Sequence, residues 1–219
     1  MNLADKHRPK TWEQFVGNDA VVKRIRAVIG RAGFGDGAGE MVYLSGASGT
    51  GKTTAAHLIA RALGVEPGGA WNYLEIDGDK CSVDEVRALD DRTMAAGLYR
   101  DCWQVFLVNE AHAMSPRAVQ AWLTLAERLP ARWLVIFTTT REPDSDLFGE
   151  FTEPLLSRCK VFQLTSQGLA QPFAEHVRRI AQAEGLDGKP EAWYLRLIQA
   201  KHNNLRAALQ AVDAGEAAA

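Results

Sequence analysis

One loop brings together residue types that bind phosphate, and it reads Gly46-Ala47-Ser48-Gly49-Thr50-Gly51-Lys52-Thr53. It fits the pattern G-x-x-x-x-G-K-S/T, and it joins an apolar run at 41–45, a predicted strand, to a predicted helix at 52–63. Glycines let backbone N–H groups curl around phosphates, and the helix N-terminus adds partial positive charge. Lys52 would reach the β- and γ-phosphates, Thr53 would give its hydroxyl to Mg²⁺, and Thr54 would complete the nucleotide site. The pattern therefore predicts nucleoside triphosphate binding; a glycine-rich turn that binds nothing is the alternative.

A second chemical feature follows the apolar run 105–108, where Asn109 and Glu110 end a predicted strand. A carboxylate there can polarise the water that attacks the γ-phosphate, which is the catalytic role we predict for Glu110; a solvated glutamate is the alternative. An aspartate would normally hold Mg²⁺ at the preceding position, whereas Asn109 lacks that charge, at a cost on the order of 1–3 kcal/mol. We expect Mg²⁺ to bind more weakly, through Thr53, Asn109 and the phosphates, and hydrolysis to be slow.

The predicted strand at 133–138 runs into the threonines Thr138, Thr139 and Thr140. A hydroxyl at this place could hold the attacking water or the γ-phosphate, and Thr139 is the best single choice. Three consecutive threonines also suit an ordinary strand end, because threonine favours the extended backbone.

The elements that must position these residues alternate between strands and helices. Strands are predicted at 41–45, 72–76, 103–108, 133–138 and 160–164. Helices are predicted at 19–29, capped by Asp19, at 52–63, after Ser82 with a capping box to Glu85, and after Ser115-Pro116. This alternation indicates an α/β fold with a parallel sheet over 1–165. A second, purely helical domain is predicted at 166–219, with a break at 185–190 that separates two segments.

The whole chain has the composition of a globular protein. It has 219 residues, 47% hydrophobic and 24% charged, enough for one core and a small second domain, and its net charge of -2 gives no overall attraction to nucleic acid. Cys81, Cys102 and Cys159 form no C-x-x-C pair, which argues against a disulfide framework or a zinc site and indicates reduced core thiols in a cytoplasmic protein. No apolar run predicts a secretion signal or a membrane span.

The order of these motifs resembles that of the sliding-clamp loader ATPases of the AAA+ superfamily. The resemblance rests on the phosphate loop, Asn-Glu-Ala-His at 109–112, the threonine-rich strand, Ser157-Arg158-Cys159 and Asn204-Leu205-Arg206. The segment 7–17 is also similar to the start of the bacterial gamma/tau subunit of DNA polymerase III and of replication factor C subunits. The resemblance covers about residues 6–213 and implies a AAA+ core with a helical lid. It also implies adenine contacts from Arg8, Pro9, Val16 and Gly17.

The resemblance implies further roles and partners. Arg158 would be an arginine finger that acts in trans on the ATP of a neighbouring subunit, an effect worth roughly 10³–10⁵ in rate in GTPases. Arg206 would be a lid arginine that contacts the γ-phosphate; without the resemblance both would be solvated arginines. The implied cofactors are ATP and Mg²⁺, and the implied partners are other clamp-loader subunits, a sliding clamp and primer-template DNA, with no membrane. DNA contacts are expected at Lys80, Arg87 and Arg92, unless these form only a solvated helix face.

Some features depart from the family pattern. The bacterial gamma/tau subunit carries a four-cysteine zinc module after the phosphate-loop helix, whereas residues 64–73 contain no cysteine, which favours the replication factor C or phage type. The helical collar domain that holds the pentamer together is expected to be absent. The leading hypothesis is an ATPase that loads a clamp during DNA replication. The alternatives are an ATP-binding structural subunit with little hydrolysis, because of Asn109, and another AAA+ DNA-remodelling motor.

Overall fold

A computed structural model describes residues 2–69, 71–94, 102–140 and 153–217 of the chain. Within these ranges one parallel sheet has the strand order β2-β3-β4-β1-β5. The strands are β1 (Glu40–Ser45), β2 (Tyr73–Asp77), β3 (Gln104–Asn109), β4 (Trp133–Thr139) and β5 (Lys160–Gln163). Each predicted strand is confirmed to within one residue at either end. The carboxyl ends of β1, β3 and β4 therefore meet at one edge of the sheet, where the candidate site residues lie.

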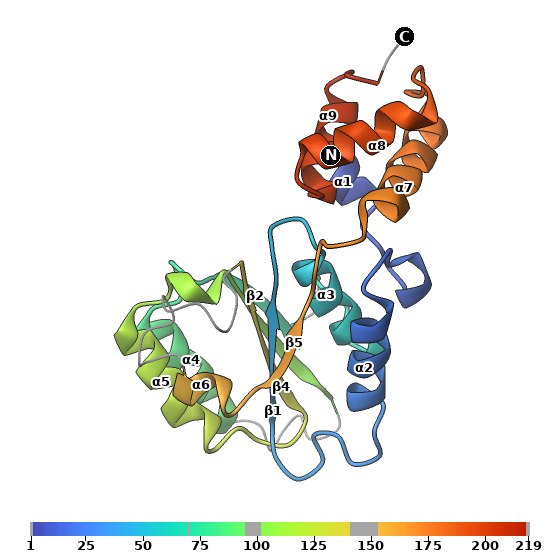
Figure 1. Cartoon of the computed structure of the whole chain (residues 1–219). Coiled ribbons are helices and arrows are strands. Elements are labelled where there is room, and N and C mark those ends of the chain that lie inside the picture. Colours follow the sequence, from blue (N-terminus) through green and yellow to red (C-terminus); the bar gives the residue numbers. More distant parts are fainter. Residues whose placement is uncertain (1, 70, 95–101, 141–152, 218–219) are drawn as a thin grey trace.

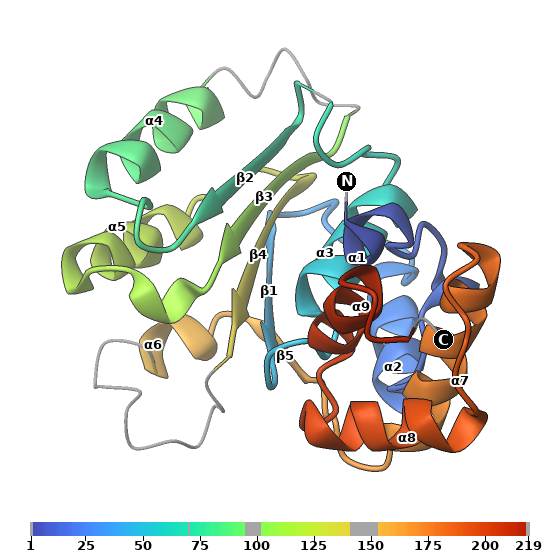
Figure 2. The ribbon, with the colours of Figure 1, turned by 90° about the horizontal axis from the view of Figure 1, so that it is seen from above.

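Helices cover both faces of the sheet (Figures 1 and 2). One face carries α2 (Asp19–Ile29) and α3 (Lys52–Ala62); the other carries α4 (Val83–Met94), α5 (Pro116–Ala126) and α6 (Glu153–Leu156). Along β3, Val105 and Leu107 pack in the core under α3, whereas Phe106 and Val108 pack in the core under α5. Successive side chains of a strand point to opposite faces, so each central strand holds two hydrophobic cores together.

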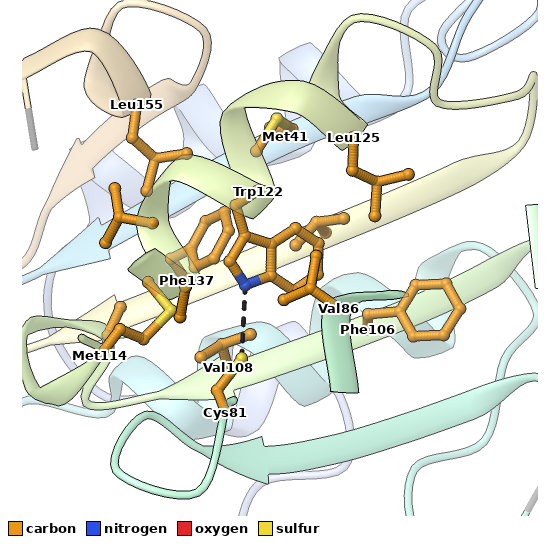
Figure 3. Packing of buried hydrophobic residues seen from close by; sticks show 14 of the residues in the cluster. Met41, Cys81, Val86, Phe106, Val108, Met114, Trp122, Leu125, Phe137 and Leu155 are labelled. Atoms are coloured by element: carbon orange, nitrogen blue, oxygen red, sulfur yellow. Dashed lines mark hydrogen bonds between the residues drawn. The ribbon is translucent and has the colours of Figure 1, made fainter. Parts of the chain in front are cut away.

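Trp122 is the central side chain of the core under α5 (Figure 3). It is fully buried, its indole Nε1 donates to Cys81 Sγ at 3.3 Å, and its ring meets Phe137 edge to face at 5.3 Å. These contacts fix α5 against β4 and against the turn before α4. Cys81 is indeed a core thiol, but Cys102 is exposed, so the prediction that all three cysteines lie in the core is wrong at that position.

Two helix starts follow the predicted chemistry, and a third does not. Ser115 Oγ accepts from Ala118 N at 3.2 Å. Ser82 Oγ accepts from Glu85 N at 3.2 Å, which is the serine half of the predicted capping box, whereas Ser82 N donates to Lys80 O at 2.9 Å. Asp19, predicted as a cap, is instead the first residue of α2, and the cap position is taken by Asn18. The Asn18 amide pairs with both backbone groups of Thr165, at 3.1 and 2.9 Å. The start of α2 is thus fixed by a tertiary contact that no local pattern indicates.

The chain after β5 forms a separate helical layer next to the phosphate-loop end of α3 (Figure 1). Its helices are α7 (Ala170–Ala183), α8 (Glu191–Ala200) and α9 (Leu205–Asp213), and α1 (Leu3–Lys6) packs into the same core. The second predicted segment is divided in two, because His202 and Asn203 adopt left-handed backbone with φ of 53° and 57°. Within the described ranges, none of the helices combines the length and apolar character needed to cross a bilayer.

Candidate functional site

The phosphate loop connects β1 to α3, as predicted, and its geometry depends on glycine, as Gly49 and Gly51 show. Gly49 and Gly51 have φ of 78° and 95°, in the left-handed region. A Cβ at Gly49 would lie 2.1 Å from Asn204 Oδ1, and a Cβ at Gly51 would lie 2.8 Å from the Phe15 ring. Both the backbone conformation and the close neighbours therefore require glycine at these positions.

Lys52 is only 6% exposed, and its ammonium donates to Gly46 O at 2.8 Å and to Ala47 O at 3.0 Å. Burial lowers the pKa of Lys52 to about 8; the Glu110 carboxylate opposes this shift and the Arg206 guanidinium adds to it. A bound anion would stabilise the charged form of a buried lysine that has a second cation nearby. The electrostatics of the loop therefore fit a polyphosphate.

Glu110 follows β3 with left-handed backbone, φ 50° and ψ 50°. Its Oε2 accepts from Thr140 N at 3.3 Å and from Thr140 Oγ1 at 3.1 Å, and it lies 3.3 Å from His112 Nδ1. The side chain is 46% exposed, so a water molecule can reach the carboxylate. A left-handed backbone at a non-glycine residue is costly and is found at functional sites more often than elsewhere. The structure thus holds a solvent-accessible carboxylate directly after the end of β3.

Asn109 lies beside the phosphate-loop threonine, as predicted. Its Oδ1 accepts from Thr53 Oγ1 at 3.1 Å and from Thr138 Oγ1 at 3.2 Å, while its Nδ2 donates to Glu75 Oε1 at 2.6 Å. The carboxylate on one side and the hydroxyls on the other determine which way the amide points. Hydroxyl and amide oxygens are suitable ligands for Mg²⁺ or for its water shell, so Thr53 and Asn109 fit this ion.

Glu75 was not predicted from the sequence. It accepts from Tyr73 OH at 2.8 Å and lies 3.0 Å from His57 Nε2. Burial opposes ionisation, but hydrogen bonds with His57, Tyr73 and Asn109 outweigh it and lower the pKa of Glu75 to about 2. Its sequence context shows only an ordinary strand residue, because two of its three partners, Asn109 and His57, come from β3 and α3.

The three threonines at the end of β4 have different neighbours. Thr139 is fully buried, and its Oγ1 lies 3.0 Å from His112 Nδ1. Thr138 bonds to Asn109, and Thr140 bonds to Glu110. The geometry therefore favours Thr138 or Thr140 over the predicted Thr139 for direct contact with the reacting groups, and the catalytic role of Thr139 stays a prediction.

A pocket with about 500 Å³ of free space, open to solvent, lies between the phosphate loop and the helical layer. Its lining residues are Ala4, His7, Arg8, Pro9, Gly49, Gly51, Thr54, His176, Leu205, Arg206 and Leu209. The predicted adenine contacts Arg8 and Pro9 are among them. Val16 instead packs against the helical core, and a Cβ at Gly17 would meet Leu169 at 2.8 Å.

Three lining residues, His176, Leu205 and Leu209, come from the helical layer and were missed. Leu205 belongs to the Asn204-Leu205-Arg206 motif but was not assigned a contact, and only the packing of this layer against the loop reveals the three residues as lining the pocket. Burial lowers the pKa of His176 to about 4, with Arg179 as a further cause, so this imidazole is neutral near pH 7. The pocket wall therefore combines apolar side chains with a neutral imidazole, which suits a flat heteroaromatic base.

The two predicted arginines lie in different places. Arg206 lines the pocket beside the phosphate loop, as predicted for a lid arginine. Arg158 donates to Pro154 O at 3.0 Å and to Glu127 Oε1 at 3.2 Å, next to α5 and α6. These helices cover the face of the sheet opposite α3. The structure thus brings Arg206, but not Arg158, to the phosphate loop of the same chain.

The residues expected to contact DNA each have a local partner. Lys80 pairs with Asp77 at 3.0 Å, and Arg87 pairs with Asp84 at 3.2 Å. Arg92 donates to the Trp71 carbonyl oxygen at 3.2 Å. Exposed pairs of this kind are worth little, so they neither support nor oppose a role in DNA binding.

Two family models match the chain. The model of the ATPase family associated with various cellular activities (AAA) matches residues 42–166, which include the phosphate loop, Glu110 and the threonines of β4. The model of the Holliday junction DNA helicase RuvB P-loop domain matches residues 7–72.

Among known proteins, the chain is similar to replication subunits and, in fold, to RuvB. It is 29% identical to DNA polymerase III subunit tau of Salmonella typhimurium, over 96% of this chain and 34% of that protein. It is 25% identical to the Replication factor C small subunit of Natronomonas pharaonis, over 96% of this chain and 61% of that protein. The chain thus spans about a third of the bacterial relative and less than two thirds of the archaeal one.

The structure of the Thermotoga maritima RuvB Holliday junction branch migration motor superposes with a TM-score of 0.69 at 20% identity, covering 94% of this chain and 63% of that one. At this identity the likeness concerns the fold alone, and it confirms the predicted α/β core with a phosphate loop. Because the AAA model covers more than half of its residues, the chain belongs to the ATPase family associated with various cellular activities, with clamp-loader subunits among its relatives.

Proposed function

We propose that this chain is an ATP-binding and ATP-hydrolysing subunit of the clamp-loader type, acting with other subunits to load a sliding clamp onto primed DNA. Its three unpaired cysteines agree with a role in the cytoplasm. One observation carries the proposal. Lys52, the Thr53–Asn109 contact and the Glu110 carboxylate lie together at the carboxyl ends of the strands. The similarity to clamp-loader subunits over 96% of the chain supports this process in particular.

In the proposed reaction the chain's residues bind and orient ATP. Lys52 and the loop N–H groups hold the β- and γ-phosphates. Thr53 and Asn109 would hold Mg²⁺, which would neutralise phosphate charge when bound. Glu110, held by Thr140, polarises the water that attacks the γ-phosphorus, giving ADP and phosphate. Arg206 contacts the γ-phosphate from the same chain. Arg158 acts in trans, where it stabilises the charge that develops on the phosphate of a neighbouring subunit.

The residues after about 165 form the lid in this proposal. Asn204, which precedes α9, donates to Ser48 Oγ at 3.4 Å, so the helical layer already contacts the phosphate loop. Nucleotide bound in the pocket would touch both the loop and Arg206. The lid position would therefore change with the state of the nucleotide.

Two other functions have support of their own. The match of residues 7–72 to the RuvB P-loop domain favours a DNA-remodelling motor. The neutral Asn109 favours a structural subunit that binds ATP and hydrolyses little.

Capture of the sliding clamp from the same cell tests the proposal against the motor. Immobilised wild-type chain should retain the clamp when ATP is present, and primed DNA with clamp should raise ATP turnover. Lys52→Ala, which removes the phosphate-binding cation, is the control and should retain no clamp. Turnover stimulated by four-way junctions, with no retention of clamp at any ATP concentration, would show that the motor is the correct function.

A further inference from the structure

Glu75 lies on β2, the strand next to β3, on the face of the sheet that carries α3. The parallel register places Glu75 opposite Leu107, which packs in the core under α3. Asn109 is two residues beyond Leu107, so its side chain points to the same face. The carboxylate and the amide meet there, with Glu75 Oε1 accepting from Asn109 Nδ2 at 2.6 Å.

The position of Glu75 is fixed from two further sides. Tyr73 OH donates to its Oε2 at 2.8 Å, and His57 Nε2 lies 3.0 Å from the same oxygen. His57 is four residues after Thr53 on α3, so the two side chains share one face of that helix. Thr53 is therefore part of α3, and Glu75 contacts the same helix through His57.

The Asn109 amide connects the carboxylate to the phosphate loop. Its N–H faces Glu75, and its oxygen accepts the hydroxyl hydrogen of Thr53. Rotating the amide by half a turn would place its oxygen against a carboxylate and its N–H groups against Thr53. Glu75 thus fixes the orientation in which Asn109 offers an oxygen to the loop.

We propose that Glu75 is a positioning residue of the magnesium–nucleotide site, which orients Asn109 and supplies from the neighbouring strand the negative charge that Asn109 lacks. This role rests on the proposed function, because it requires that the loop bind a nucleoside triphosphate with Mg²⁺. It also explains why asparagine suits position 109. An aspartate there would place two carboxylates within hydrogen-bond distance of each other, and like charges at that separation repel strongly.

A double-mutant cycle on the full chain tests this role. The variants are Glu75→Gln, Asn109→Asp and the double variant, and the measurement is the affinity for a fluorescent ATP analogue at increasing Mg²⁺ concentration. Glu75→Gln should raise the Mg²⁺ concentration at half-maximal effect by about threefold to tenfold, and leave affinity without Mg²⁺ unchanged. The double variant exchanges the carboxylate and the amide, and should restore the wild-type Mg²⁺ concentration to within about twofold.

Glu66→Gln is the matched control, because Glu66 is an exposed carboxylate that pairs with Arg61 of α3 at 2.7 Å. It removes the same charge without touching Asn109 and should leave the Mg²⁺ titration unchanged. A Mg²⁺ titration of Glu75→Gln equal to that of wild type would overturn the role of Glu75 and leave nucleotide binding intact. If Glu75→Gln lowered nucleotide affinity equally with and without Mg²⁺, that would also overturn the role and would indicate a purely structural one. Wild-type chain that binds no nucleotide at all would overturn the proposed function as well.

Discussion

Lys52 shows how a single residue sets the conditions for binding. Its ammonium is buried and bonded to two carbonyl oxygens of its own loop. Burial lowers its pKa to about 8, so a substantial fraction of the side chain is neutral just above physiological pH. Binding of a triphosphate needs the protonated, positively charged form of Lys52. Deprotonation of Lys52 therefore weakens triphosphate binding.

The affinity for ATP should consequently fall as pH rises through 8. With Lys52 titrating at about 8 in the free protein, affinity should drop about fivefold between pH 8 and pH 9, because only the protonated fraction binds. Titration with a fluorescent nucleotide at fixed ionic strength measures this. Lys80→Gln removes an exposed lysine and should show the same drop. An affinity that stays constant up to pH 9.5 would show that the Lys52 charge is not limiting.

Sequence alone predicted the site residues that belong to local motifs, and missed those that tertiary contacts create. Lys52, Thr53 and Asn109 follow from spacing along the chain, and the Thr53–Asn109 contact is present. Glu75 has no such signal, because the partners that connect it to the site, Asn109 and His57, lie on other elements. The choice among the β4 threonines also needed the structure, since it depends on which face of the strand each side chain occupies.

At the scale of elements, the start of α9 is where the helical layer meets the phosphate loop. Asn204 Oδ1 caps the helix by accepting from Ala207 N at 3.0 Å, and its Nδ2 donates to Ser48 Oγ at 3.4 Å. One side chain therefore performs two separable tasks. The cap stabilises α9, and the contact with Ser48 keeps Arg206, two residues further on, near the loop.

Variants of Asn204 should separate these tasks. Asn204→Ala removes both and should lower the free energy of unfolding by about 1 kcal/mol, the usual loss for an N-cap, and also weaken nucleotide binding. Asn204→Asp keeps the cap but replaces the amide donor by a carboxylate, which would repel a triphosphate even if it accepts from the Ser48 hydroxyl, so only binding should weaken, as in the control Ser48→Ala. Urea unfolding and nucleotide titration measure the two effects. Equal losses of stability for the alanine and aspartate variants would contradict the capping role.

The boundaries of helices and strands were predictable where apolar periodicity extends over a long stretch of sequence. All five strands and the helices α2, α3 and α5 follow from apolar periodicity and cap residues. The short helices α1 and α6 were missed, because four residues carry too little periodicity. The turn before α9 was also missed, although histidine and asparagine are among the residue types enriched in left-handed backbone, the conformation that His202 and Asn203 adopt.

At the scale of the whole molecule, the proposed arginine finger lies apart from the site in its own chain. Arg206 lies in the pocket, whereas Arg158 lies beside α5 and α6, on the other face of the sheet from α3. In the proposed function, an arginine in that place would serve the nucleotide of a neighbour. We therefore expect a subunit that binds ATP on its own and hydrolyses it efficiently only within an assembly.

Steady-state ATP turnover of wild type and Glu110→Gln, with partner subunits, sliding clamp and primed DNA present, tests the central claim most directly. Both proteins should bind ATP with similar affinity, because the substitution keeps the shape of the side chain. Wild type should turn over ATP at least about 10²-fold faster, since the variant lacks the carboxylate that polarises water. Turnover that is the same for the two proteins in every condition would contradict the account.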